Sequence, residues 1–392
     1  MRSPAAAALI GIIAIAVNLR SSTAGIGATL PAVQTDLGIP AALSAGLVVL
    51  PLLCYSAFAP ISPVVERALG PRYTVVVALA VIAAGILLRS LPGSVLLWVG
   101  TGMLGAGIAV LNVVTPSIVK RTHPHRVPGV TSLYSAAQGG GAALATVLVA
   151  AILAHDPGQW RWALGSAIVF AVAGLAIWVP LAIGHRPRPA TSAPPEPGPR
   201  ARPNPWRQPL AWHIAGFMAM QSVVYYVLIT WLPSIEQQAG TAPATTALHQ
   251  TILQAAGLIS ALLGSTIMAR SKSQRPIVVI ATAAMTIGVA GVLVHPHLGA
   301  LWCAVIGAAG GLTLVTALSL FGLRTHRHDE TVAVSAMSQA IAYLAAAIAP
   351  SVVGLVHDIT GNWSVPLYLL LLLLLWQLYS GWKSSAVGSV WQ

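Results

Sequence analysis

The sequence predicts an all-α membrane protein with twelve transmembrane helices arranged in two six-helix halves. Its composition gives the first indication, because 56% of the 392 residues are hydrophobic and only 7% are charged, whereas soluble domains carry about 25% charged residues. Apolar stretches of roughly 20 residues recur along the chain, each long enough to cross about 30 Å of hydrocarbon as a helix. The stretches exceed the length of a barrel strand and lack its alternation, which indicates helices.

A break in this pattern separates the two halves. The segment 184–209 contains nine prolines and five arginines, so we expect an extended cytoplasmic linker there and no helix. It divides the chain into an N-terminal half (1–183) and a C-terminal half (210–392). The predicted spans are 5–33, 43–65, 74–91, 95–119, 128–153 and 161–183 in the first half, and 210–233, 245–269, 275–294, 298–322, 331–355 and 363–383 in the second.

The basic residues predict the orientation of these spans. Of the 20 Lys and Arg residues, 17 fall on one side of the predicted spans, whereas Arg89 and Arg161 fall on the other and Arg20 lies inside the first span. Because loops rich in Lys and Arg stay in the cytoplasm, we expect both termini to be cytoplasmic in a multi-pass inner-membrane protein. The charge of +12 lies in short loops, which argues against a nucleic-acid-binding face.

The two halves repeat each other. Arg121-Thr122-His123 recurs as Arg324-Thr325-His326 at an offset of 203 residues, and Leu30-Pro31 recurs as Leu232-Pro233 at an offset of 202. Two distant pairs with nearly equal offsets predict homologous halves in the same orientation, the parallel repeat that some secondary transporters contain.

One ionisable residue, Arg20, lies clearly in the middle of a span. A mid-span Arg costs about 2.5–3.5 kcal/mol on insertion scales, so its presence needs a reason. The eight carboxylates fall at span ends, in loops or in the linker, and offer Arg20 no mid-membrane counter-ion. Either carbonyls, Asn18 and cavity water solvate Arg20, or an anionic substrate completes its shell. A planar guanidinium suits a small planar anion.

Polar side chains near mid-span form a second group of candidates. Several of them pair at i, i+4, which places both members on one helix face. Either they line a central cavity as substrate-binding residues, or they form interhelical hydrogen bonds worth about 0.6 kcal/mol each. These candidates are Asn18, Asn112, Tyr134, Gln138, Gln221, Tyr225, Gln339 and Tyr343.

Few residues suggest other chemistry. His249 lies inside a predicted span and could titrate during transport; Glu236 and Asp36 are the other candidates for proton coupling. The histidines of the two repeated Arg-Thr-His loops are expected to be ordinary loop residues. Cys54 and Cys303 stand singly in separate spans, a spacing that supports neither a metal site nor a disulfide. We therefore expect no cofactor, no metal and no enzyme activity.

Four stretches carry a resemblance to a known family. They are Asn18-Leu19-Arg20 followed by Leu30-Pro31; Gly107 to Pro116 running into Lys120-Arg121; Gln221-Ser222 with Tyr225 and Trp231-Leu232-Pro233; and Met337-Ser338-Gln339 with Tyr343, Pro350, Asp358 and Thr360-Gly361. In this order they resemble the cyanate permease branch of the major facilitator superfamily, which also contains 2-nitroimidazole transporters. The resemblance implies a small anionic or polar planar substrate, and a central cavity that includes Asn18, Arg20, Asn112, Gln221 and Tyr225.

The loop from Glu66 to Arg72 resembles the acidic-Arg-Gly-Arg signature of the superfamily, with one extra residue before the glycine. In that family the loop clamps the two halves in the outward-open state, which implies a gating role for Glu66, Arg67 and Arg72. We therefore expect a monomeric secondary active or facilitative transporter of a small polar solute that works by alternating access. Its outer surface is expected to contact the lipid bilayer. The alternatives are a proton-coupled exporter of drugs or nitroimidazoles and, from another class, a non-transporting membrane sensor.

Overall fold

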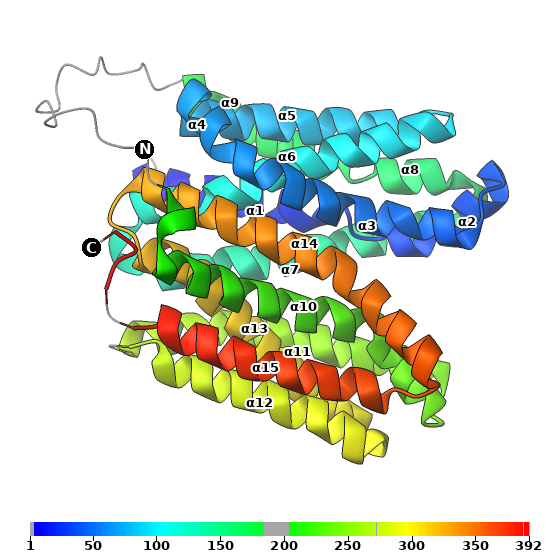
Figure 1. Cartoon of the computed structure of the whole chain (residues 1–392). Helices are drawn as coiled ribbons and strands as arrows, with labels where there is room; N and C mark the ends of the chain where they lie inside the picture. Colours follow the sequence, from blue (N-terminus) through cyan, green and yellow to red (C-terminus); the bar gives the residue numbers. More distant parts are fainter. Residues whose placement is uncertain (1–3, 184–203, 272, 387, 392) are drawn as a thin grey trace, which may run out of the picture.

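The computed structural model describes residues 4–183, 204–271, 273–386 and 388–391. Within these ranges the secondary structure is helical, and no strand occurs. Figure 1 shows a bundle of long helices that run roughly alongside one another, with both chain ends at the same end of the bundle. Eleven helices in the described ranges are long and apolar enough to cross a membrane, or twelve if the bent pair at the N-terminus forms one span. The predicted membrane architecture is thus confirmed.

The helix boundaries follow the predicted spans to within a few residues. The first half contains α1 (Pro4–Ser21), α2 (Ile26–Leu37), α3 (Ala41–Phe58), α4 (Ser62–Leu69), α5 (Pro71–Ser90), α6 (Ser94–Thr122), α7 (Val127–His155), α8 (Trp160–Gly165) and α9 (Ile168–Ile183). The second half contains α10 (Pro209–Gln238), α11 (Pro243–Arg270), α12 (Arg275–Val294), α13 (Gly299–Leu323), α14 (His328–Thr360) and α15 (Ser364–Ser384). Most of the expected linker lies outside the described residues, and its end, Pro205–Arg207, forms a short 3-10 turn.

The first span, predicted over 5–33, is broken in the structure. The span consists of α1 and α2, which meet at an angle of 41°. The backbone N–H groups of Thr23 and Ala24 both donate to the carbonyl of Arg20, which closes α1 with a turn. Gly25 then adopts φ 81°, a left-handed conformation that glycine reaches without a Cβ penalty. A Cβ on Gly25 would also lie 2.8 Å from the Val149 side chain of α7. Both the positive φ and this close approach therefore favour glycine at this position.

The helices connect two faces of the bundle. We define the terminal face as the end where α1 begins and α15 ends, and the opposite face as the end where α2 meets α3 (Figure 1). The connections at Gly70, between α6 and α7, and between α13 and α14 all lie at the terminal face, because each span reverses the direction of the chain. The fold thus has the two six-helix halves that the repeat predicts.

Candidate functional site

A cavity of about 590 Å³ lies between the two halves. Helices of the first half (α1, α2, α3, α6 and α7) and of the second (α10, α11 and α14) contribute its lining. A smaller lobe of about 120 Å³ adjoins it and reaches α13. Both share Arg20, Gln138, Tyr225, Tyr226, Gln254 and Tyr343 in their linings. A volume in this range suits a small molecule.

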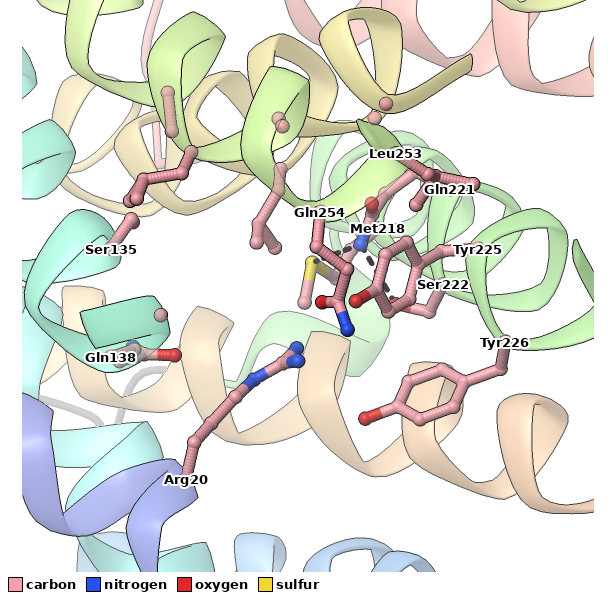
Figure 2. Close-up of a pocket in the computed structure, with 18 of the residues that line it drawn as sticks. Arg20, Ser135, Gln138, Met218, Gln221, Ser222, Tyr225, Tyr226, Leu253 and Gln254 are labelled. Atoms are coloured by element: carbon pink, nitrogen blue, oxygen red, sulfur yellow. Dashed lines mark hydrogen bonds between the residues drawn. The ribbon is translucent and has the colours of Figure 1, made fainter. Parts of the chain in front are cut away.

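Arg20 lies in the last turn of α1, immediately before the break. A cation at this place is favoured by the negative end of the helix dipole. Its guanidinium carbon lies 5.7 Å from the centre of the Tyr225 ring, within the range of a cation–π contact. Figure 2 shows the side chain extending from α1 towards Gln254 and Tyr225 of the other half. Among the described residues that line the cavity and its lobe, Arg20 alone carries a charge.

Four tyrosines surround this cation. Tyr55, Tyr225, Tyr226 and Tyr343 line the main cavity. The rings of Tyr55 and Tyr343 meet edge to face at 4.9 Å across the interface between α3 and α14, and those of Tyr225 and Tyr226 meet at 5.5 Å. Flat aromatic walls with hydroxyl tips suit a planar polar ligand, because they offer both ring surface and hydrogen bonds.

Six of the predicted binding residues line the cavity or its lobe: Arg20, Asn112, Gln138, Gln221, Tyr225 and Tyr343. Gln221 is held by hydrogen bonds within α10, since its Nε2 donates to the Ser222 hydroxyl at 2.9 Å and lies 3.9 Å from the Met218 sulfur. These bonds are drawn in Figure 2. No hydrogen bond of the Gln138 side chain is seen within the described residues, so its amide is available to a ligand.

The other three predicted residues lie outside the cavity. The Asn18 amide donates to the carbonyls of Ala14 (2.9 Å) and Phe170 (2.8 Å) and thereby joins α1 to α9. Tyr134 is 2% exposed within the hydrophobic core. The Gln339 amide donates to the Asn112 carbonyl at 2.8 Å and so joins the two halves. We remove these residues from the candidate binding site, because none of them lines the cavity or its lobe.

Sequence reasoning missed Tyr55, Tyr226 and Gln254. Gln254 lies four residues after Gln250 in α11, the same i, i+4 pattern that identified other candidates. The sequence pattern could therefore have identified Gln254 as a candidate binding residue. Tyr226 follows Tyr225 directly, and neighbouring helix residues both reach the cavity here because it wraps around α10. Tyr55 is a lone tyrosine in an apolar stretch, and nothing in its sequence neighbourhood distinguishes it.

Comparison with known proteins defines the family. The profile of the Major Facilitator Superfamily matches residues 9–350. The chain belongs to the major facilitator superfamily. It is 33% identical over 359 residues to the 2-nitroimidazole transporter of Escherichia coli, a match that covers 91% of this chain and 90% of that protein. It is 27% identical over 369 residues to the cyanate transport protein CynX of the same organism, with 91% of each chain covered.

A solved structure supports the fold. The major facilitator transporter FucP, in its outward conformation, matches with a TM-score of 0.75 at 14% identity, over 98% of this chain and 99% of that one. The expected fold and the resemblance to this superfamily are therefore confirmed, and the matching proteins named here are transporters. Like other major facilitator proteins, the chain is a multi-pass membrane transporter of small molecules.

The two halves of this major facilitator fold are joined at the terminal face. His328 Nε2 forms a hydrogen bond with the Glu66 carboxylate, and His328 Nδ1 lies 3.3 Å from the Ser117 carbonyl. Lys120 donates to the carbonyl and hydroxyl of Thr325. We call these contacts the terminal latch. Within the described residues, the hydrogen bonds between the halves that lie outside the cavity are on its terminal side, whereas the cavity extends towards the opposite face.

Of the three predicted gating residues, only Glu66 joins the halves. Arg67 is exposed and has no partner within the described residues. Arg72 donates to the Leu181 carbonyl at 2.7 Å, a contact inside the first half, because its side chain turns towards α9. The partner of Glu66 is His328, which sequence reasoning treated as an ordinary loop residue.

Two of the candidates for proton coupling meet near the opposite face. His249 Nδ1 lies 3.1 Å from both carboxylate oxygens of Glu236, and the Cys303 sulfur lies 3.7 Å from the same carboxylate. Glu236 is only 1% exposed, so it is a buried acid with one basic partner. Asp36 is far more exposed and pairs with Arg161 at 2.8 Å. Within the described part of the chain, no cluster of His, Cys, Asp and Glu has the form of a metal site.

Proposed function

We propose that the protein carries a small planar solute, either an anion such as cyanate or a small N-heterocycle, across the cytoplasmic membrane by alternating access. The supporting observation is the position of Arg20, the one charged side chain in the described lining of a cavity between the halves. A buried guanidinium without a carboxylate partner is stabilised by an anion, which it can hold with two parallel hydrogen bonds.

The broken first span adds a second attraction for an anion. Ala24 and Ile26 line the cavity, so the N-terminus of α2 borders it. The first N–H groups of a helix have no partners within that helix and carry partial positive charge. Discontinuous helices of secondary transporters use such ends to hold anionic groups of their substrates. Arg20 and the start of α2 therefore favour the same sign of ligand.

The named relatives support the choice of solute class. One of them is a 2-nitroimidazole transporter and another is a cyanate transport protein. 2-Nitroimidazole and cyanate are both small, flat or linear molecules that contain nitrogen, which agrees with a lining of four tyrosines and one guanidinium. For the orientation, we propose that the terminal face is cytoplasmic, because 17 of the 20 Lys and Arg residues belong to that side.

A ligand screen tests this proposal. We expect a small planar anion or N-heterocycle to raise the unfolding temperature of the purified protein, because a ligand that binds only the folded state stabilises it. Arg20→Ala should abolish the shift while leaving expression and monodispersity intact. Arg126→Ala, which removes an exposed arginine from a loop, should retain it. An equal shift in Arg20→Ala would contradict the proposed site.

The pair of Glu236 and His249 supports a second candidate, a proton-coupled exporter of nitroimidazole-like compounds. A buried carboxylate that bonds to a histidine can hold or release a proton between two states of the transporter. Transport into proteoliposomes with and without an imposed pH gradient separates the two candidates. Equal initial rates favour facilitated movement or exchange, whereas a rate that follows the gradient, and loses this dependence in Glu236→Gln, favours proton coupling.

A further inference from the structure

A separate cavity of about 350 Å³ lies inside the first half at the terminal face. It is walled by the ends of α1, α5, α6 and α9, and its lining shares no residue with the central cavity. Two arginines, Arg72 and Arg121, face it together with Ala7, Ala8 and Trp178. Among the described lining residues there is no carboxylate. The cavity therefore combines two positive charges with apolar walls.

Two of these side chains are held in place. Arg72 Nη1 donates to the Leu181 carbonyl at 2.7 Å, one of the last carbonyls of α9, which have no partner within their own helix. The guanidinium keeps further N–H groups for a ligand. The Trp178 indole donates to the Gly11 carbonyl at 2.9 Å, so its ring forms a fixed apolar wall. The site is preformed, which lowers the entropy lost when a ligand binds.

Arg121 is the side chain without a partner. It lies in the last turn of α6, is exposed, and forms no hydrogen bond or ion pair within the part of the chain that the structure describes. Arg72 likewise has no carboxylate there. Two like charges that face one cavity repel each other, and an anion between them converts this repulsion into attraction.

The second half provides an internal comparison. The repeat places Arg324 at the position of Arg121, and Arg324 is buried. Its guanidinium donates to the carbonyls of Ser384 and Ser385, each at 2.9 Å, and to Gln274 Oε1 at 2.7 Å. Val390 of the C-terminal segment donates back to the Arg324 carbonyl at 2.8 Å. The chain itself therefore surrounds this arginine with acceptors.

The second arginine of each half also has a counterpart in the repeat. Arg275 stands at the position of Arg72 and stacks on the Trp382 ring at 4.8 Å. Burial lowers the pKa of the Arg324 guanidinium, and the neighbouring Arg275 lowers it further, as two close cations should. In the second half, oxygens of the chain therefore surround Arg324 and an aromatic ring covers Arg275. In the first half the corresponding place is a cavity.

We propose that this cavity binds the phosphate group of an anionic phospholipid from the leaflet at the terminal face. Arginine forks match phosphate oxygens with parallel, charge-assisted hydrogen bonds. The alanines and Trp178 give the adjoining glycerol and acyl carbons an apolar surface. Basic pockets between helices on the cytoplasmic side are suited to such head groups, so the lipid source follows from the proposed orientation. A free phosphate ion shares the chemistry of recognition but has no use for the apolar walls.

Native mass spectrometry of the purified, delipidated protein tests the proposal. The probes are short-chain phosphatidylglycerol, the matching phosphatidylcholine and inorganic phosphate. We expect phosphatidylglycerol to bind the full-length wild-type protein at least tenfold more tightly than phosphatidylcholine. Arg121→Gln should weaken it roughly tenfold, the loss of one charge-assisted hydrogen bond. Arg121 has no partner to lose, so this variant should fold normally.

Two further variants test whether lipid binding depends on the space in the cavity and on the general positive charge of the terminal face. Ala8→Phe keeps both arginines but fills the space between the walls. It should weaken the binding of phosphatidylglycerol about as much as Arg121→Gln does. Arg126→Gln removes an exposed arginine from the same face and should bind the lipid as the wild type does. Equal binding of both lipids, or equal loss in Arg126→Gln, would overturn the proposal. The proposal would also be overturned if inorganic phosphate bound in a way that depends on Arg121 while the binding of phosphatidylglycerol did not depend on Arg121.

Discussion

At the scale of single residues, the geometry of Arg20 makes a prediction about the shape of the ligand. Arg20→Lys keeps the charge but loses the planar fork, so a planar anion held by two hydrogen bonds should bind about tenfold or more weakly. The measurement is isothermal titration of the purified variant with the ligand that stabilises the wild type. Undiminished affinity in Arg20→Lys would show that Arg20 acts only as a point charge.

Glu236 and His249 make a prediction about stability. His249→Leu removes the basic partner of a carboxylate that is 1% exposed, and breaking a buried pair from one side costs about 3–5 kcal/mol. We expect a clear fall in the unfolding temperature of the variant in detergent. The double variant Glu236→Leu/His249→Leu should lose less than the two single losses together, because no buried charge remains unpaired. Additive losses would mean that the two residues do not interact.

The candidate binding residues show what a sequence can specify at this scale. Arg20 was predictable because an ionisable group in mid-span is rare and has a cost. Asn18 was predicted as a binding residue together with Arg20, although residues two apart lie on nearly opposite sides of a helix. In the structure the Asn18 side chain contacts α9. Gln339 and Tyr343 share a face, yet only Tyr343 lines the cavity. Gln339 lies one turn closer to the terminal face, where the halves are in contact, and only the packing of helices from both halves determines that depth.

At the scale of helices, the apolar spans were predictable and the break in the first one was not. Hydropathy is continuous across residues 5–33, and Ser22, Thr23 and Gly25 are common in membrane helices. The break depends on the left-handed φ of Gly25 and on the close approach of α7 to it, which are tertiary facts. The consequence for the site is large, because the break places both Arg20 and the start of α2 beside the cavity.

The close packing of α13 against α11 predicts how substitutions of two α13 glycines, Gly307 and Gly310, affect stability. A Cβ on Gly307 would lie 2.1 Å from the Leu253 carbonyl of α11, whereas a Cβ on Gly310 would meet nothing closer than 3.6 Å. Gly307→Ala should therefore force α11 and α13 apart and lower the unfolding temperature by several degrees, since close approach of small residues stabilises membrane helix pairs. Gly310→Ala is the matched control and should be tolerated. Equal unfolding temperatures for the two variants would contradict this packing.

At the scale of the whole molecule, the two faces differ in how the halves meet. The terminal latch joins them on one side of the cavity, and no hydrogen bond between the halves is seen on the other side within the described residues. In the alternating-access mechanism that we propose, the terminal latch stabilises the state that is closed at the terminal face, because its partners come from opposite halves and must separate for that face to open. Under that proposal, the strength of the terminal latch contributes to the equilibrium between the two states of the transport cycle.

Weakening the terminal latch should shift this equilibrium towards a state that opens at the terminal face. His328→Ala removes the partner of Glu66, a residue 6% exposed, and a hydrogen bond to a charged group contributes about 1.5–3 kcal/mol. The ratio of the two states should then change roughly 10- to 150-fold. Spin labels at Arg126→Cys and Lys383→Cys, one in each half at the terminal face, report the opening as a longer distance in pulsed electron resonance, with Cys54 and Cys303 replaced by serine. Arg67→Ala is the control, because Arg67 lies beside Glu66 but is exposed and forms no hydrogen bond or ion pair with the other half within the described residues. A distance distribution that His328→Ala leaves unchanged would show that other contacts hold the terminal face closed.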